Sequence, residues 1–135
     1  VAILLGGGFG TIIYFKKHKE IEQQAQQEEQ AKKSALVFQD MDEMIINLNT
    51  EGKNVSFMKL KITLEVEGND NLDATQKYMP KITDVFQMYL RELRPTDVQG
   101  SVGLYRLKEE LLLRINKIIY PAQVNDILFK EVLVQ

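Results

Sequence analysis

The chain has 135 residues, no cysteine, one histidine and a net charge of −2, from 17 Lys and Arg against 19 Asp and Glu. This length accommodates one modest domain and an appendage. Nucleic acid is not an expected partner, because there is no basic surplus to neutralise phosphates. The absence of cysteine excludes disulfides and thiolate metal sites, and one histidine disfavours most hydrolase and metalloenzyme centres. We expect no catalytic, cofactor-binding or metal site.

The first segment, residues 1–15, is VAILLGGGFGTIIYF and carries no charge. At about 1.5 Å per residue it covers about 22 Å of the roughly 30 Å of hydrocarbon in a bilayer. We expect the end of a single transmembrane helix whose first turns are missing. A signal peptide is disfavoured, because Tyr14 and Phe15, followed by lysines, form an interfacial anchor without a cleavage site. Gly6 and Gly10 form a small-xxx-small pair suited to packing on another membrane helix, although membrane helices are rich in glycine in any case.

The second segment, residues 16–35, is polar and contains good helix formers without Gly or Pro. Glu28 and Glu29 each precede a lysine by four residues, which is the spacing of a stabilising pair on a helix. We therefore expect a helical juxtamembrane linker. It has no apolar stripe and should stand in water, with His18 as a solvated surface side chain.

Residues 36–135 are numerous enough for one hydrophobic core and form the predicted domain. The segment Met58–Glu67 alternates apolar and polar side chains without error, which predicts a strand with one buried face and one wet face. The shorter run Met44–Leu48 predicts another strand, and residues 49–54 a turn between the two.

Two helices are predicted after these strands. The segment Glu67–Asp73 lacks a glycine at the sixth position and a glutamate at the twelfth position of an EF-hand calcium loop, so it is interpreted as a turn with an Asp or Asn helix cap. The following helix should extend to about Leu93 and kink or restart at Pro80. A second long helix is predicted over Ser101–Ile119, where Tyr120 and a proline end it.

The last segment, residues 124–135, is apolar on both faces of an extended chain. One predicted face holds Leu128, Val132 and Val134, and the other holds Ile127, Phe129 and Leu133. This pattern predicts an interior strand, or a strand whose second face meets a partner. The order of elements predicts an α+β domain in which two long helices cover one face of a small antiparallel or mixed sheet.

No motif in the sequence strongly indicates a catalytic or nucleotide-binding site. The GGGFG run has neither a preceding strand nor a terminal Lys-Ser/Thr pair, so it does not predict a nucleotide site. The carboxylate clusters are better explained as solvated faces. An anchor, a polar linker and a compact domain together indicate a membrane-tethered interaction module.

Several segments, in this order, resemble the FliL family of flagellar basal-body proteins. The matching residues are Phe38, Met41, Asp42, Met44–Leu48, Met58–Glu67, Pro80, Ile82, Asp84, Gly103, Leu107, Glu110, Leu111, Arg114, Ile115, Asn116, Phe129, Glu131 and Gln135. The chain departs from the family pattern at Glu43, Lys108 and Val132, where proline, arginine and an aromatic residue are common. The fold expectation is unaffected by these departures.

The resemblance implies a non-catalytic, single-pass inner-membrane protein of the bacterial flagellar basal body, with its linker and domain in the periplasm. It implies a fold similar to the stomatin (SPFH) type domain. Family members associate with the stator proteins MotA/MotB and form a homo-oligomeric ring around MotB that supports stator recruitment or activation and torque for motility. On this basis Val55, Phe57, Phe129 and Leu133 are candidate contacts with other copies or partners. The alternative is a membrane-tethered periplasmic module of an unrelated secretion or lipid-handling assembly.

Overall fold

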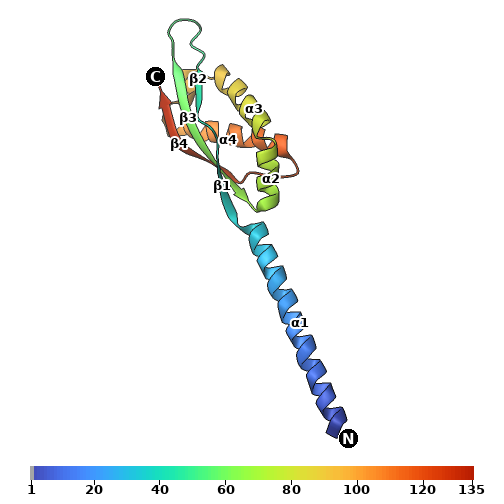
Figure 1. Cartoon of the computed structure of the whole chain (residues 1–135). Coiled ribbons are helices and arrows are strands. Elements are labelled where there is room, and N and C mark those ends of the chain that lie inside the picture. The colour runs from blue at the N-terminus through green and yellow to red at the C-terminus, as the bar shows by residue number, and fades with distance from the viewer. Residues whose placement is uncertain (1) are drawn as a thin grey trace. The chain divides into compact units, whose positions relative to one another are not determined.

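The structure is a computed structural model that describes the backbone of residues 2–135 and the side chains of residues 10–31 and 35–135 (Figure 1). The chain divides between Ala35 and Leu36 into an N-terminal helix and an α+β domain. Helix α1 spans Ala2–Ser34 without interruption, so the predicted polar linker is helical as far as Ser34. None of the helices in the described part of the chain combines the length and the apolar run needed to cross a bilayer.

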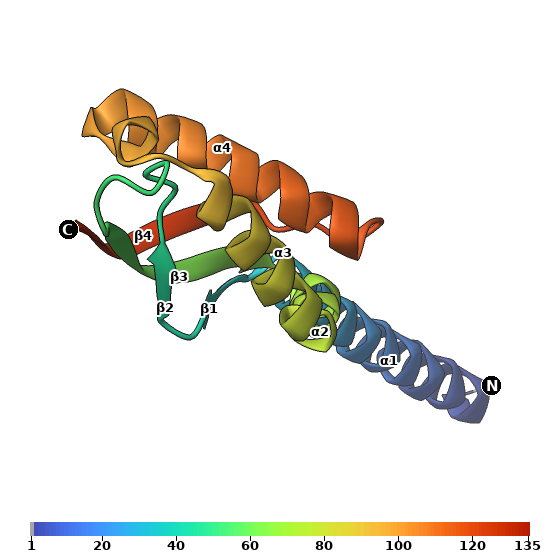
Figure 2. The ribbon, with the colours of Figure 1, turned by 90° about the horizontal axis from the view of Figure 1, so that it is seen from above.

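The domain contains an antiparallel four-stranded sheet with β3 at its centre. The longest strand, β3, pairs with β4 along one side and with β1 and then β2 along the other. Helix α4 lies beside β4 and α3 lies beside α4 (Figure 2). The elements are β1 (Leu36–Asp40), β2 (Met44–Asn47), β3 (Phe57–Glu67), α2 (Asn69–Lys77), α3 (Met79–Glu92), the 3-10 helix η1 (Pro95–Val98), α4 (Gly100–Ile119) and β4 (Asp126–Val134).

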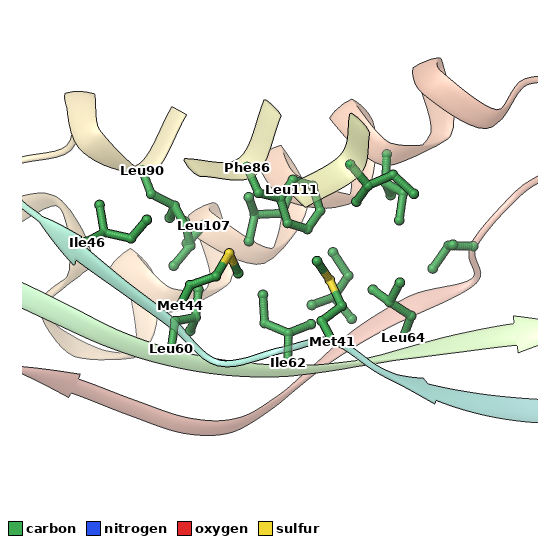
Figure 3. Packing of buried hydrophobic residues seen from close by; sticks show 14 of the residues in the cluster. Met41, Met44, Ile46, Leu60, Ile62, Leu64, Phe86, Leu90, Leu107 and Leu111 are labelled. Atoms are coloured by element: carbon green, nitrogen blue, oxygen red, sulfur yellow. The ribbon is translucent and has the colours of Figure 1, made fainter. Parts of the chain in front are cut away.

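The hydrophobic core lies between the sheet and the helices α3 and α4. The predicted alternation of the central strand is confirmed, because every apolar side chain from Met58 to Val66 at alternate positions is fully buried. Figure 3 shows Leu60 and Ile62 pointing from β3 towards Phe86 of α3 and Leu111 of α4. Burial of five such side chains contributes on the order of 10 kcal/mol before conformational entropy is subtracted.

One residue of the predicted wet face is buried. Thr63 is only 2% exposed, and β1 and β4 flank it on both sides. Its hydroxyl donates a hydrogen bond of 2.5 Å to Oδ1 of Asp40. Because the buried hydroxyl group has this hydrogen-bond partner, the burial of Thr63 between the neighbouring strands costs little free energy.

A glycine and a proline mark the starts of α2 and α3, the first two helices of the domain. The predicted restart at Pro80 is confirmed: α2 ends at Lys77, and Pro80 lies in the first turn of α3, where a missing N–H leaves no helical bond unmade. The predicted Asp or Asn cap of the preceding helix is wrong. Gly68 occupies that position with φ +79°, a left-handed backbone conformation that glycine adopts without steric cost.

The predicted faces of the last strand are also wrong, because β4 contains a β-bulge. Lys61 pairs with Glu131, but Ile62 pairs with Phe129, which leaves Lys130 as the additional residue. A bulge inverts the alternation of side chains beyond it. The core side therefore holds Ile127, Phe129, Val132 and Val134, and the opposite side holds Leu128 and Leu133. β4 pairs only with β3 and exposes Leu133, so it is an edge strand and not an interior strand. The alternative, that its second face meets a partner, stays a prediction.

Asparagine side chains form hydrogen bonds with the backbone of the loop between α4 and β4. The side chain of Asn116 donates to the carbonyl oxygen of Val124 at 3.2 Å and accepts from its N–H at 2.8 Å. Asn71 of α2 accepts a hydrogen bond of 3.0 Å from the N–H of Gln123. These bonds satisfy backbone groups outside the regular elements and position the start of β4.

Candidate interaction surfaces

The face of the sheet turned away from α3 and α4, here called the outer sheet face, exposes large apolar side chains. Leu36 and Phe38 of β1 are 53% and 56% exposed, Ile45 of β2 is 67% exposed, and Leu133 of β4 is 41% exposed. Leu36 and Phe38 alternate with half-buried residues of β1, and Ile45 lies between buried residues of β2. Leu133 pairs with Lys59 of the exposed side of β3. Exposed apolar residues gathered on one face are typical of an interaction surface.

Ion pairs cross this outer sheet face between the strands. Lys59 of β3 lies 3.5 Å from a carboxylate oxygen of Glu43 and 3.6 Å from one of Glu131. Lys130 lies 3.5 Å from Oδ1 of Asp40. The hydrogen bond from the Thr63 hydroxyl, and then the charge of Lys130, hold the pKa of Asp40 below its ordinary value. These pairs are largely solvent-exposed, so they fix side-chain positions more than they stabilise the domain.

The strands and their loops carry an excess of negative charge. Residues 36–67 and 124–135, which form the strands and their loops, contain eight Asp and Glu and four Lys and Arg, a net charge of −4. While Lys59 and Lys130 are each paired, Glu65 makes no ion pair with the side chains that the structure describes. The outer sheet face also holds the exposed Lys61, so it combines apolar side chains with charges of both signs, within a strand layer that is negative in sum.

A second exposed apolar surface lies on α4, on the side away from the sheet. The buried side of this helix is formed by Leu107, Leu111 and Ile115. Val102, Tyr105 and Leu113 lie on the opposite side and are 70%, 66% and 53% exposed. These three residues of the exposed side, between which the exposed Arg106 and Glu109 also lie, are here called the α4 stripe.

A shallow hollow of about 260 Å³ adjoins the α4 stripe between α3 and α4. Its lining residues are Val85, Glu110, Leu113, Arg114, Lys117 and Ile118. The guanidinium of Arg114 lies 4.1 Å from the centre of the Tyr89 ring, and its Nε is buried without a hydrogen-bond partner in the described structure. Burial and the charge of Glu110 raise the pKa of Tyr89, against an opposite effect from Arg114.

The helical layer has the opposite charge balance to the sheet. Residues 79–119 contain seven Lys and Arg and five Asp and Glu, a net charge of +2. Among the described side chains neither Arg114 nor Lys117 forms an ion pair with a carboxylate. Within the same part of the chain, no group of three or more His, Asp or Glu side chains is placed to hold a metal ion. The hollow offers binding through charge and apolar contact.

The contact residues predicted from the sequence do not form one patch. Phe57 and Leu133 both lie on the outer sheet face, where Leu133 pairs with Lys59 and Phe57 stands opposite Gln135. Val55 is 89% exposed in the loop between β2 and β3, whereas Phe129 packs against the core. All four remain predictions as partner contacts.

The predicted glycine pair on α1 is described in part. A Cβ atom built on Gly10 would meet no atom within 4 Å, which leaves room for a neighbouring helix. Gly6 lies outside the residues whose surroundings the structure describes. The packing of this pair on a partner helix stays a prediction.

The sequence did not lead us to expect that Phe38, Ile45 and the α4 stripe form exposed apolar surfaces. Alternation within the short strands indicates these two positions, since Ile45 stands between buried residues of β2 and Phe38 between half-buried residues of β1. The stripe lies opposite the predicted buried face of the second long helix. Apolar residues on both sides of one element are the pattern that would have indicated these surfaces.

Comparison with known proteins identifies the family. The model of the family "Flagellar basal body-associated protein FliL" matches residues 38–135. A flagellar FliL protein of Caulobacter vibrioides is 39% identical over 99 residues, which cover 73% of this chain and 48% of the relative. A flagellar protein FliL of Aquifex aeolicus is 31% identical over 91 residues, which cover 67% of this chain and 56% of the relative. The chain thus spans about half the length of these curated relatives, and its match with the family model covers nearly all of the α+β domain, so the chain belongs to the FliL family of flagellar basal body-associated proteins.

Proposed function

We propose that this chain associates with the MotA/MotB stator and forms a homo-oligomeric ring around MotB in the periplasm, where it supports stator recruitment or activation and hence torque. The observation that carries the proposal is the family match, which begins at Phe38 and continues to Gln135. Because the chain covers about half of its relatives, the partners of the whole protein are part of the proposal.

The proposed location is the inner membrane, with residues 1–15 in the single-pass anchor and residues 16–35 as the linker to a periplasmic domain. The side chains from Ile12 to Phe15 support this placement, because all four are more than half exposed on α1. Apolar side chains of this size are stabilised by transfer from water to hydrocarbon. The polar helix after them would carry the domain away from the bilayer.

The proposed role is one of binding and assembly without catalysis, on a domain of the stomatin type. The outer sheet face and the α4 stripe support it, because both expose apolar side chains on rigid elements. Two different binding surfaces on one subunit are what a closed ring needs.

Deletion of residues 36–135 in the native organism tests the proposal. We expect reduced swimming or swarming with filaments largely assembled, and co-purification of the full chain with the stator. Leu60→Lys in the full chain should reproduce the deletion, because it places an unpaired charge at a position that is 0% exposed. Asp73→Lys is the matched control on an exposed helix position and should leave motility intact.

Normal motility in every medium, together with no association with the stator, would refute the proposal. Co-purification with a secretion or lipid-handling assembly in place of the stator would favour the alternative of a module in an unrelated envelope machine.

A further inference from the structure

We infer that the outer sheet face of one copy binds the α3–α4 surface of the next copy, in a head-to-tail arrangement. The α3–α4 surface comprises the α4 stripe and the adjoining hollow. This inference rests on the self-assembly in the proposed function and adds the two faces that meet. The occupant of each surface is therefore a second copy of this chain.

The placement of the two surfaces supports a contact that repeats from copy to copy. The core separates them, since Leu60 of β3 and Leu111 of α4 point towards each other from the two layers (Figure 3). Phe38 and Leu113 therefore lie on opposite sides of the domain. A copy that uses one surface keeps the other free, and such heterologous contacts produce a ring when they close.

Charge favours this pairing over a symmetric one. The strand segments carry a net charge of −4 and residues 79–119 carry +2, so sheet against sheet would oppose like charges. Glu65 has no ion-pair partner among the described side chains, and neither has Lys117.

The open edge of β4 offers a competing route, in which copies would join by continuing the sheet. Two features make that edge a poor template. The carboxylate of Asp126 accepts the N–H of Ile127 at 2.8 Å, and the bulge at Lys130 interrupts regular pairing. Bulges and charged residues are common means of blocking strand addition at an edge.

Paired cysteines test the inference directly, because the chain has no native cysteine. The full-length chain carrying both Leu113→Cys and Leu133→Cys is treated in its native membrane with a short bis-maleimide. We expect a ladder of covalent oligomers that extends beyond the dimer. The matched control carries Phe38→Cys and Leu133→Cys, both on the outer sheet face, and should give no covalent oligomers.

Charge reversal gives an independent readout in the same cross-linking background. Glu65→Lys and Lys117→Glu should each reduce the oligomers severalfold, and the two together should restore them. Circular dichroism of each purified variant checks that the domain is folded.

The inference is overturned if the same-face control gives covalent oligomers. It is also overturned if the cross-face pair gives none while an amine-reactive cross-linker still produces a ladder from the unaltered chain. In that case the ring of the proposed function stands and other surfaces build it. If neither reagent yields a ladder, both the inference and the proposed ring are refuted.

Discussion

Gly103 of α4 offers a quantitative test of the packing between α4 and η1. In an ordinary helix interior, replacement of glycine by alanine stabilises a protein by about 1 kcal/mol. Here a Cβ at position 103 would lie 2.8 Å from the carbonyl oxygen of Asp97 and 3.2 Å from the carbonyl carbon of Val98. Both are backbone atoms, which cannot rotate aside as a side chain does. Overpacking of this kind costs about 1–3 kcal/mol. Because the gain of about 1 kcal/mol from helix propensity is subtracted from this cost, we expect Gly103→Ala to destabilise the domain by up to about 2 kcal/mol.

Urea unfolding of the full chain, followed by circular dichroism, measures this difference in free energy. Glu109→Ala is the matched control in the same helix, because Glu109 is exposed, and should change the unfolding free energy by less than about 0.5 kcal/mol. A gain of about 1 kcal/mol for Gly103→Ala would refute the reasoning, since it would mean that helix propensity decides the outcome and that η1 leaves room for the methyl group.

Four further variants test the two sides of β3, the hydrogen bonds of Asn116 and the ionisation of Asp40. Leu60→Lys should abolish the cooperative thermal transition while Lys61→Leu on the exposed side shifts it little; the reverse result would place the wrong face of β3 in the core. Asn116→Ala should lower the unfolding free energy by about 1–3 kcal/mol, because both backbone groups of Val124 lose their partner, and an unchanged urea midpoint would contradict this. The lowered pKa of Asp40 means that the fold favours its ionised form, a contribution present above the ordinary value of 3.8 and lost as pH falls through the lowered pKa. Asp40→Asn should therefore make unfolding less sensitive to acid, and equal acid sensitivity of the two chains would exclude this role.

The sequence predicts the elements whose pattern is local. The alternation of Met58–Glu67 identifies the central strand because only one of its faces meets the helices. Pro80 marks a helix start because its ring and missing N–H have the same effect in any context. The position of α4 follows in the same way from the periodic leucines and isoleucines that face the sheet.

Features that depend on pairing between distant segments were not predictable. Only the register between Lys61 and Glu131 reveals the bulge that moves Val132 to the core side. Thr63 is buried because two other strands flank it, although it alternates with apolar residues as an exposed position does. The outer sheet face arises in the same way, since strands far apart in the chain bring Phe38 and Leu133 onto one surface.

Electron cryotomography of flagellar motors in intact cells gives the most direct test of the proposed assembly around the stator. Cells that express the full chain should show ring-shaped density around each stator just outside the inner membrane, and this density should disappear when residues 36–135 are deleted. Identical motor density in the two strains would contradict the proposed assembly around MotB.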